Sequence, residues 1–303
     1  MAMPSTPRPS LNRPLIAILF MCATTVVLFP SLNTAMKHLA SIYGVPEVIF
    51  MRSTGHMVIM LALLMPGHGF AIFRTQRLGW QLGRSALQGA STGLYTTALI
   101  FIPLTTATTV AFTAPLLVVA LSGPMLGERV GPRRWAAVLV GFIGALIIIR
   151  PGGAVMHWAD FLVIGSAACY AAYQLLTRRI ALYDSSRTTG IYTIVVSLIV
   201  SAAIVPFFWT TPVSWIDWGL FASMGIAGGL GHFCMVKAYQ YGQASMVGPF
   251  DYGQLIGAAV LGSLVFSEFP DLWTWIGAAI LIASGIYIAR REAVLTKRRQ
   301  VLT

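Results

Sequence analysis

Charged side chains are scarce in this chain of 303 residues: 10% are Asp, Glu, Lys or Arg, whereas a soluble domain carries about 25%. Apolar residues make up 57% of the chain, and the mean hydropathy is +0.78. So little polar surface excludes a water-soluble globule of this length. The apolar residues also stand in blocks as long as the roughly 20 residues that a helix needs to cross a bilayer. The sequence therefore predicts an all-α integral membrane protein.

Cysteine and histidine are few and scattered. Cys22, Cys169 and Cys234 each stand alone in an apolar block, and no two histidines have the spacing of a helical metal site. No Gly-x-Ser-x-Gly nucleophile motif stands out, and a phosphate-binding Gly-x-x-x-x-Gly-Lys loop is absent. We therefore expect no metal, no cofactor and no catalytic residue. A membrane-embedded enzyme stays the less favoured alternative, and the spans offer no charged rings for a channel.

The net charge of +11 does not indicate nucleic-acid binding, because the basic residues stand at the ends of apolar blocks. Basic residues in such places set membrane topology and contact anionic lipids. The expected partners are the lipid bilayer and a small-molecule substrate, with no nucleic acid and no obligatory protein partner.

Ten transmembrane helices are predicted, separated by short breaks with proline or glycine such as Pro103 and Gly131-Pro132. Arginines gather in alternate breaks, and Arg150 is the one basic residue on the other side. Because cytoplasmic loops carry the excess of Lys and Arg, both termini are expected in the cytoplasm of a bacterial inner membrane. Residues 1–13 are expected to be a disordered tail and 292–303 a basic tail. The predicted helices are 14–40, 47–65, 82–102, 105–126, 133–149, 159–181, 188–209, 216–240, 245–267 and 272–290.

The two halves of the chain, 14–150 and 151–291, look alike. Glu128 closes the fourth span and Glu268 the ninth, and each is followed by a Trp-containing helix. The loop after Glu128 is basic, whereas the loop after Glu268 carries Asp271 and no base. Five spans per half, with opposite loop charges, predict a five-plus-five inverted repeat. Such repeats place a substrate site near the midplane and give alternating access by rocking.

The segment from Thr105 to Gly152 and the segment from Ala238 to Ala289 are typical of the two halves of one family. With ten spans and the glutamates at the ends of the fourth and ninth, the chain resembles the EamA branch of the drug/metabolite transporter superfamily, which includes bacterial amino-acid exporters. The resemblance covers residues 14 to about 290. It implies a central cavity lined by the first, third, fourth, sixth, eighth and ninth spans.

Helical spacing over those spans selects residues with aromatic rings or polar groups on shared faces. A lining of this kind suits a small amphipathic molecule, although Gly, Ser and Thr on the same faces also serve helix packing. The candidate cavity residues are Asn33, Tyr95, Phe112, Tyr170, Tyr173, His232 and Tyr252.

Three charged residues inside the spans are candidates for coupling or an ion pair, because membrane-embedded charge is costly. Asp251 could pair with Lys237, titrate, or receive a substrate ammonium. Lys237 could instead snorkel to the interface, and Lys37, at the outer end of the first span, is expected to snorkel. Arg52 could meet a substrate carboxylate, act in a gate or anchor to headgroups.

Taken with the resemblance, these features predict a secondary transporter or facilitator. It would move small amphipathic metabolites across the inner membrane by alternating access. Export of large neutral or aromatic amino acids is the first expectation, and import of S-adenosylmethionine or another metabolite is the alternative.

Overall fold

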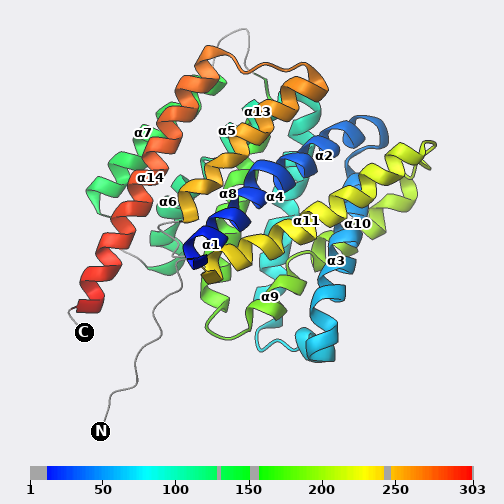
Figure 1. Cartoon of the computed structure of the whole chain (residues 1–303), viewed down its shortest axis with the longest axis horizontal. Coiled ribbons are helices and arrows are strands. Elements are labelled where there is room, and N and C mark those ends of the chain that lie inside the picture. The colour runs from blue at the N-terminus through cyan, green and yellow to red at the C-terminus, as the bar shows by residue number, and fades with distance from the viewer. Residues whose placement is uncertain (1–11, 128–130, 151–156, 242–246, 302–303) are drawn as a thin grey trace.

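Helices form every regular element of the computed structural model within the residues that the structure describes, 12–127, 131–150, 157–241 and 247–301 (Figure 1). The elements are α1 (Asn12–Cys22), η1 (Ala23–Leu28), α2 (Phe29–Tyr43), α3 (Val45–His68), η2 (Gly69–Phe73), α4 (Leu78–Phe101), α5 (Leu104–Ala111), α6 (Ala114–Leu126), α7 (Pro132–Ile149), α8 (Ala159–Ile180), α9 (Ser186–Tyr192), α10 (Val195–Ile204), η3 (Val205–Phe207), α11 (Trp215–Tyr241), η4 (Gly248–Tyr252), α13 (Gly253–Phe266) and α14 (Leu272–Val301).

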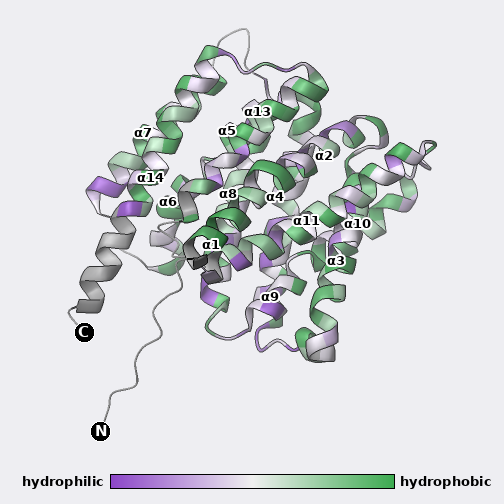
Figure 2. Cartoon of the chain, in the orientation of Figure 1, coloured by the Kyte–Doolittle hydropathy of each residue, from purple (hydrophilic) through white to green (hydrophobic). Residues whose placement is uncertain are grey.

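Seven segments of the described chain are long and apolar enough to cross a membrane. Apolar residues run along these helices in Figure 2, as expected where a bilayer is the solvent. A shorter apolar helical segment covers Phe250–Phe266. The all-helical prediction is confirmed for the described residues. The seven spans are Leu15–Tyr43, Val45–Gly67, Leu104–Leu126, Pro132–Ile149, Ala159–Ile180, Ser186–Phe207 and Leu272–Arg290.

Four predicted helices are interrupted: the seventh divides into α9 and α10 at Thr193 and Ile194, and the other three have a proline beside the irregular turn. The first contains a π-helical segment, η1, directly before Pro30. The fourth divides into α5 and α6 at Phe112 and Thr113, ahead of Pro115. The ninth begins with the 3₁₀ turn η4 before α13. Because proline has no amide hydrogen and its ring clashes with the preceding turn, helices bend or change type at these positions.

The ends of the chain differ from the prediction at the C-terminal side. The last helix, α14, continues to Val301 instead of ending near residue 290, so the predicted basic tail is helical over most of its length. The predicted disordered N-terminal tail falls largely on residues 1–11, which lie outside the described residues. Glu128, the closing glutamate of the first half, also lies outside them.

The helices pair in a regular way. At one edge of the molecule α7 and α14 run side by side (Figure 1), and α4 packs on α8. On the other side α3 packs on α11 and α10, while α13 lies between α2 and α5. The backbones of α3 and α11 approach so closely that a Cβ added to Gly55 would stand 2.7 Å from the Cα of Gly225. Small residues permit this approach, which is the usual way helices associate in membranes.

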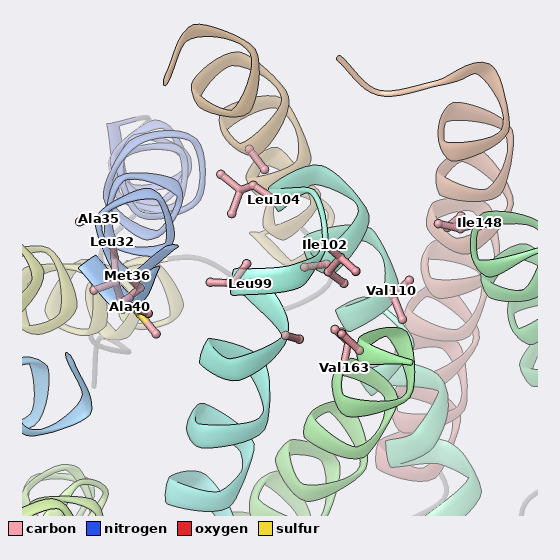
Figure 3. Close-up of a cluster of buried hydrophobic side chains, with 14 of the residues drawn as sticks. Leu32, Ala35, Met36, Ala40, Leu99, Ile102, Leu104, Val110, Ile148 and Val163 are labelled. Atoms are coloured by element: carbon pink, nitrogen blue, oxygen red, sulfur yellow. The ribbon is translucent and has the colours of Figure 1, made fainter. Parts of the chain in front are cut away.

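The main apolar core lies where the two halves of the chain meet. Figure 3 shows part of it, with Leu32 and Met36 from α2 near Leu99 of α4 and Leu104 of α5. Val163 of α8 belongs to the same cluster. The core therefore joins helices from both halves and holds the central residues described next.

Candidate functional site

Two histidines face each other across the contact between α3 and α11. The rings of His56 and His232 have centroids 5.0 Å apart and an interplanar angle of 27°. Their approach follows from the small residues around them, because His56 Nδ1 would stand 3.7 Å from a Cβ on Gly228. His56 is buried and its Nδ1 has no hydrogen-bond partner, while His232 is half-buried. His232 thus lies beside a buried histidine at the contact between α3 and α11.

Arg52 lies one turn before His56 on α3 and extends this polar region toward α4. Its Nη1 donates a long hydrogen bond of 3.4 Å to Thr92 Oγ1, and its Nε is buried without a partner. Gln88, one turn before Thr92, bonds the same hydroxyl at 3.5 Å, and its Oε1 is also left unsatisfied. Residues Arg52, His56, Gln88, Thr92 and His232 are called the central polar cluster below.

Phe29 covers one side of the central polar cluster. Its ring meets His232 edge to face at 5.6 Å and 64°. Asn33 follows one turn later on α2 and is half-buried. The π-helical segment before Phe29 holds this part of the first span against the second half of the chain. Thr24 Oγ1 donates to Gly231 O at 3.3 Å, and Thr25 Oγ1 donates to Phe250 O at 2.9 Å. Phe29 was not among the predicted site residues, although its spacing to Asn33 pointed to it.

Tyr95 lies one turn beyond Thr92 on α4, half-buried against the main core. Its hydroxyl and that of Thr108 on α5 are 3.2 Å apart. This contact joins the third and fourth predicted spans and gives the phenol the partner that a buried hydroxyl requires. Tyr95 therefore lies near the central polar cluster, although no hydrogen bond links them.

Phe112 and Tyr252 meet at the two helix interruptions, with ring centroids 4.9 Å apart. The Tyr252 hydroxyl lies directly against the backbone of Gly285 on α14. Both residues are half-buried. They form a second aromatic group, set between the fourth, ninth and tenth predicted spans.

Tyr170 and Tyr173 stack on α8 with ring centroids 5.6 Å apart. The guanidinium of Arg84 lies 4.9 Å from the centre of the Tyr173 ring. Arg84, two residues inside the predicted helix 82–102, is fully buried within α4. It bonds Thr193 Oγ1 at 3.0 Å and the carbonyl oxygen of Thr189, so it fastens α4 to α9. These tyrosines thus border a structural arginine.

Asp251 and Lys237 do not pair with each other in the described part of the chain. Asp251 Oδ1 accepts a hydrogen bond from Gln254 Nε2 at 3.1 Å. Lys237 Nζ lies 5.5 Å from the centre of the Phe233 ring, a cation–π contact on its own helix. Of the alternatives for Asp251, the pair with Lys237 is therefore absent here, and the others stay open.

Lys37 corrects another expectation, since it does not simply extend to the membrane surface. It is buried, pairs with Glu268 and donates a 2.9 Å hydrogen bond to Ile102 O. Glu268 Oε2 also accepts from Leu104 N at 2.9 Å. We call Lys37 and Glu268 the buried ion pair. Arg150 and Asp271 form a more exposed pair nearby, also between the two halves.

At the other end of the bundle Asp184, in the turn before α9, ties α8 and α9 to the start of α4. It accepts hydrogen bonds from Gln76 N and Gln81 Nε2, each at 2.9 Å, and from the Thr75 hydroxyl. Burial favours the neutral acid, but these hydrogen bonds outweigh it and hold the pKa of Asp184 below its ordinary value.

A hollow of about 570 Å³ opens between the ends of α6 and α8. None of the candidate site residues lines it. Within the described residues no three His, Cys, Asp or Glu side chains gather as a metal site would need. The hollow is lined by Met125, Leu126, Gly127, Arg178, Arg179 and Leu182.

Comparison with known families gives two matches along the chain. Residues 14–150 and 157–290 each match the EamA-like transporter family. A solved crystal structure aligns with a TM-score of 0.61 and 20% identity, covering 92% of this chain and 97% of the other. That likeness is at the level of the fold.

Named relatives are similar over most of their length. The riboflavin transporter of Vibrio cholerae is 30% identical and covers 95% of this chain and 98% of the relative. The S-adenosylmethionine uptake transporter of Rickettsia felis is 28% identical, over 84% and 85% of the two chains. The pseudopaline exporter of Pseudomonas aeruginosa is 26% identical, over 87% and 93%.

Proposed function

Because this chain belongs to the EamA-like transporter family, we propose that it is a secondary transporter that moves small amphipathic metabolites bearing an aromatic ring by alternating access. It is a transporter and not an enzyme. The relatives described above are also named as transporters. Those relatives carry riboflavin, S-adenosylmethionine or pseudopaline by their names, so small-molecule transport is the shared activity.

The observation that carries the proposal is that helix contacts in one half have counterparts in the other. The α4–α8 contact corresponds to that of α11 with α1 and α2 when the halves are exchanged. In the same way α3–α11 corresponds to α10–α4, and α6–α8 to α13–α2. Together with the double family match, this supports an inverted repeat with 14–150 and 151–291 as its halves.

The ten-span topology is part of this proposal. To the seven long apolar segments we add α4, α11 and Phe250–Phe266. An odd number of spans in each half inverts the second half, and the basic loops then favour cytoplasmic termini in a bacterial inner membrane. In this orientation the buried ion pair lies at the outer end, and the hollow between α6 and α8 opens to the cytoplasm.

The substrate class follows from the groups near the middle of the bundle. Phe29, Tyr95, Phe112 and Tyr252 supply aromatic surface, and the central polar cluster supplies hydrogen bonds. Amphipathic metabolites with a ring fit this mixture. Amino acids with large side chains, S-adenosylmethionine and riboflavin are the three chemical types to test.

The test is counterflow in liposomes that contain the purified protein. The panel is tryptophan, phenylalanine, methionine, S-adenosylmethionine and riboflavin, each with and without a pH gradient. Saturable uptake of one type, stimulated by the same compound inside, is the expected result. A pH gradient that drives accumulation would assign proton coupling. Absence of flux above empty liposomes for the whole panel would refute the proposed substrate class.

A further inference from the structure

Arg52 has fewer hydrogen bonds than a buried guanidinium requires. A guanidinium carries five N–H donors, and the structure gives Arg52 one hydrogen bond, to Thr92 at 3.4 Å. Its Nε is shielded and unsatisfied, while the residue as a whole keeps part of its surface accessible. Unused donor capacity therefore remains on a side chain that is not fully buried.

No carboxylate neutralises Arg52 within the described part of the chain. The ion pairs there are Lys37–Glu268 and Arg150–Asp271. Its hydrogen-bond partner, Thr92, is neutral and also accepts from Gln88, and the histidine one turn later, His56, stacks on His232. A buried charge without a counter-ion is costly in any protein and more so in a membrane. The described residues therefore leave the Arg52 guanidinium without a counter-ion.

The position of Arg52 argues against a lipid headgroup as that counter-ion. Arg52 lies about two turns into α3, roughly 10 Å from the start of the helix at 1.5 Å per residue. It points to α4 rather than away from the bundle, as its bond to Thr92 shows. Thr92 itself is 7% exposed, and His56 is 2% exposed.

We propose that Arg52 is the binding site for an anionic oxygen group of the transported molecule, in the first place a carboxylate. Thr92 orients the guanidinium through its hydroxyl, and His56 lies one helical turn away on the same helix. The rings of Phe29 and His232 give the apolar part of the molecule a surface beside the charge. The inference rests on the proposed function and narrows its substrate class to acidic or zwitterionic metabolites.

The test uses two pairs of probes that differ in one acidic group. Tryptophan is compared with tryptophanamide, and flavin mononucleotide with riboflavin. Binding to the purified full chain is measured by the rise in melting temperature with probe concentration, because a ligand of the folded state stabilises it. The acidic member of at least one pair should bind at least about tenfold more tightly, as expected for a charge-assisted contact of about 1.5–3 kcal/mol.

Variants at Arg52 then separate recognition from folding. Arg52→Gln should abolish the preference for the acidic probe but leave binding of its neutral counterpart within about threefold. Arg52→Lys should keep part of the preference. Without any probe, Arg52→Gln should melt at the same or a higher temperature, because it removes an uncompensated buried charge.

Arg187→Gln is the matched control, since it removes an exposed arginine from α9. It should leave the acidic preference unchanged. The proposal is overturned if wild-type protein binds both members of each pair equally, or if Arg52→Gln lowers both equally. It is also overturned if Arg52→Gln melts well below the wild type without probe, which would make Arg52 structural. If the protein transports neutral substrates and Arg52→Gln does not change their flux, the proposed function stands even though the inference about Arg52 fails.

Discussion

The rings of Phe112 and Tyr252 lie 4.9 Å apart, and the two residues occupy the same place in their own halves of the chain. Each stands the same number of residues before the glutamate that ends its span, Glu128 or Glu268. Each also stands at an interruption of its helix. Residues that correspond under an approximate two-fold axis can touch each other only close to that axis. The pair therefore locates the centre of the proposed inverted repeat.

Removing either ring should impair the movement of one half against the other. We expect Phe112→Ala and Tyr252→Ala each to lower the initial counterflow rate by about fivefold, since an aromatic pair contributes about 0.5–1.5 kcal/mol. The double variant should be little worse than the weaker single one, because both changes delete one contact. Tyr252→Phe, which keeps the ring, is the control. If the double variant lost counterflow rate by the product of the two single losses, the two rings would not act through a shared contact.

The buried ion pair should matter more to stability than its exposed neighbour. Glu268→Gln leaves Lys37 buried without an anion, with a cost of up to about 3 kcal/mol, so the melting temperature should fall by about 5 °C or more. Asp271→Asn breaks the pair with Arg150, which is more exposed, at 30% and 42% of the two side chains. It should cost at most about 1 kcal/mol.

Melting curves of the two variants in one detergent check this difference. The double change Lys37→Met with Glu268→Gln should recover part of the loss, since it removes the stranded charge as well. Equal shifts in melting temperature for Glu268→Gln and Asp271→Asn would show that the burial of Lys37 does not increase the contribution of its ion pair to stability.

The close approach of α3 and α11 depends on the absence of a side chain at Gly55. Gly55→Ala would place a methyl group 2.7 Å from the Cα of Gly225, so the helices must separate. We expect a loss of about 1–3 kcal/mol, as for other overpacked contacts, together with weaker substrate binding because His56 and His232 move apart. Binding and melting temperature are measured together.

Gly83→Ala is the matched control on α4, where an added Cβ meets nothing within 4 Å. It should be neutral or stabilising by up to about 1 kcal/mol, because alanine has the higher helix propensity. If Gly55→Ala behaved like Gly83→Ala, the packing of α3 on α11 would not be what aligns the two histidines.

Acid should weaken the end of the bundle that Asp184 holds together. Because hydrogen bonds lower its pKa in the folded protein, below about 3.9 in the unfolded chain, its stabilisation is present above about pH 4. It is lost as the pH falls through the folded-state pKa. The wild-type melting temperature should therefore drop between about pH 4 and pH 3 more steeply than that of Asp184→Asn. Parallel curves would rule out this contribution.

Composition and spacing were enough to predict an all-helical membrane protein, because a membrane-spanning helix is a local property of about 20 residues. The same reasoning selected His232 and Arg52 as candidates, since charge or imidazole inside an apolar block stands out. It did not foresee the burial of Arg84, because a basic residue near a span end looks the same whether it faces the membrane surface or bonds Thr189 and Thr193. The predictions of substrate-cavity residues, His232 and Arg52 among the candidates, stay untested.

Contacts between the halves were harder to foresee. Lys37 looked like a residue reaching the membrane surface, but Glu268, far along the chain, pairs with it. Asp251 was one candidate partner for Lys237 and instead accepts a bond from Gln254 on the next turn. Such pairings depend on how distant helices are placed side by side, which helical periodicity within one span does not record.

The uncompensated guanidinium of Arg52 has an electrical consequence. A carrier that returns empty moves this positive charge through part of the membrane field, whereas a carrier loaded with an anion moves none. Displacing a full charge across 100 mV amounts to about 2.3 kcal/mol, so membrane voltage should act on the empty carrier's step and spare the loaded one. Capacitive currents from proteoliposomes on a solid support should show this displacement in wild-type protein and not in Arg52→Gln. The membrane potential would then set how quickly the transporter resets between cargoes.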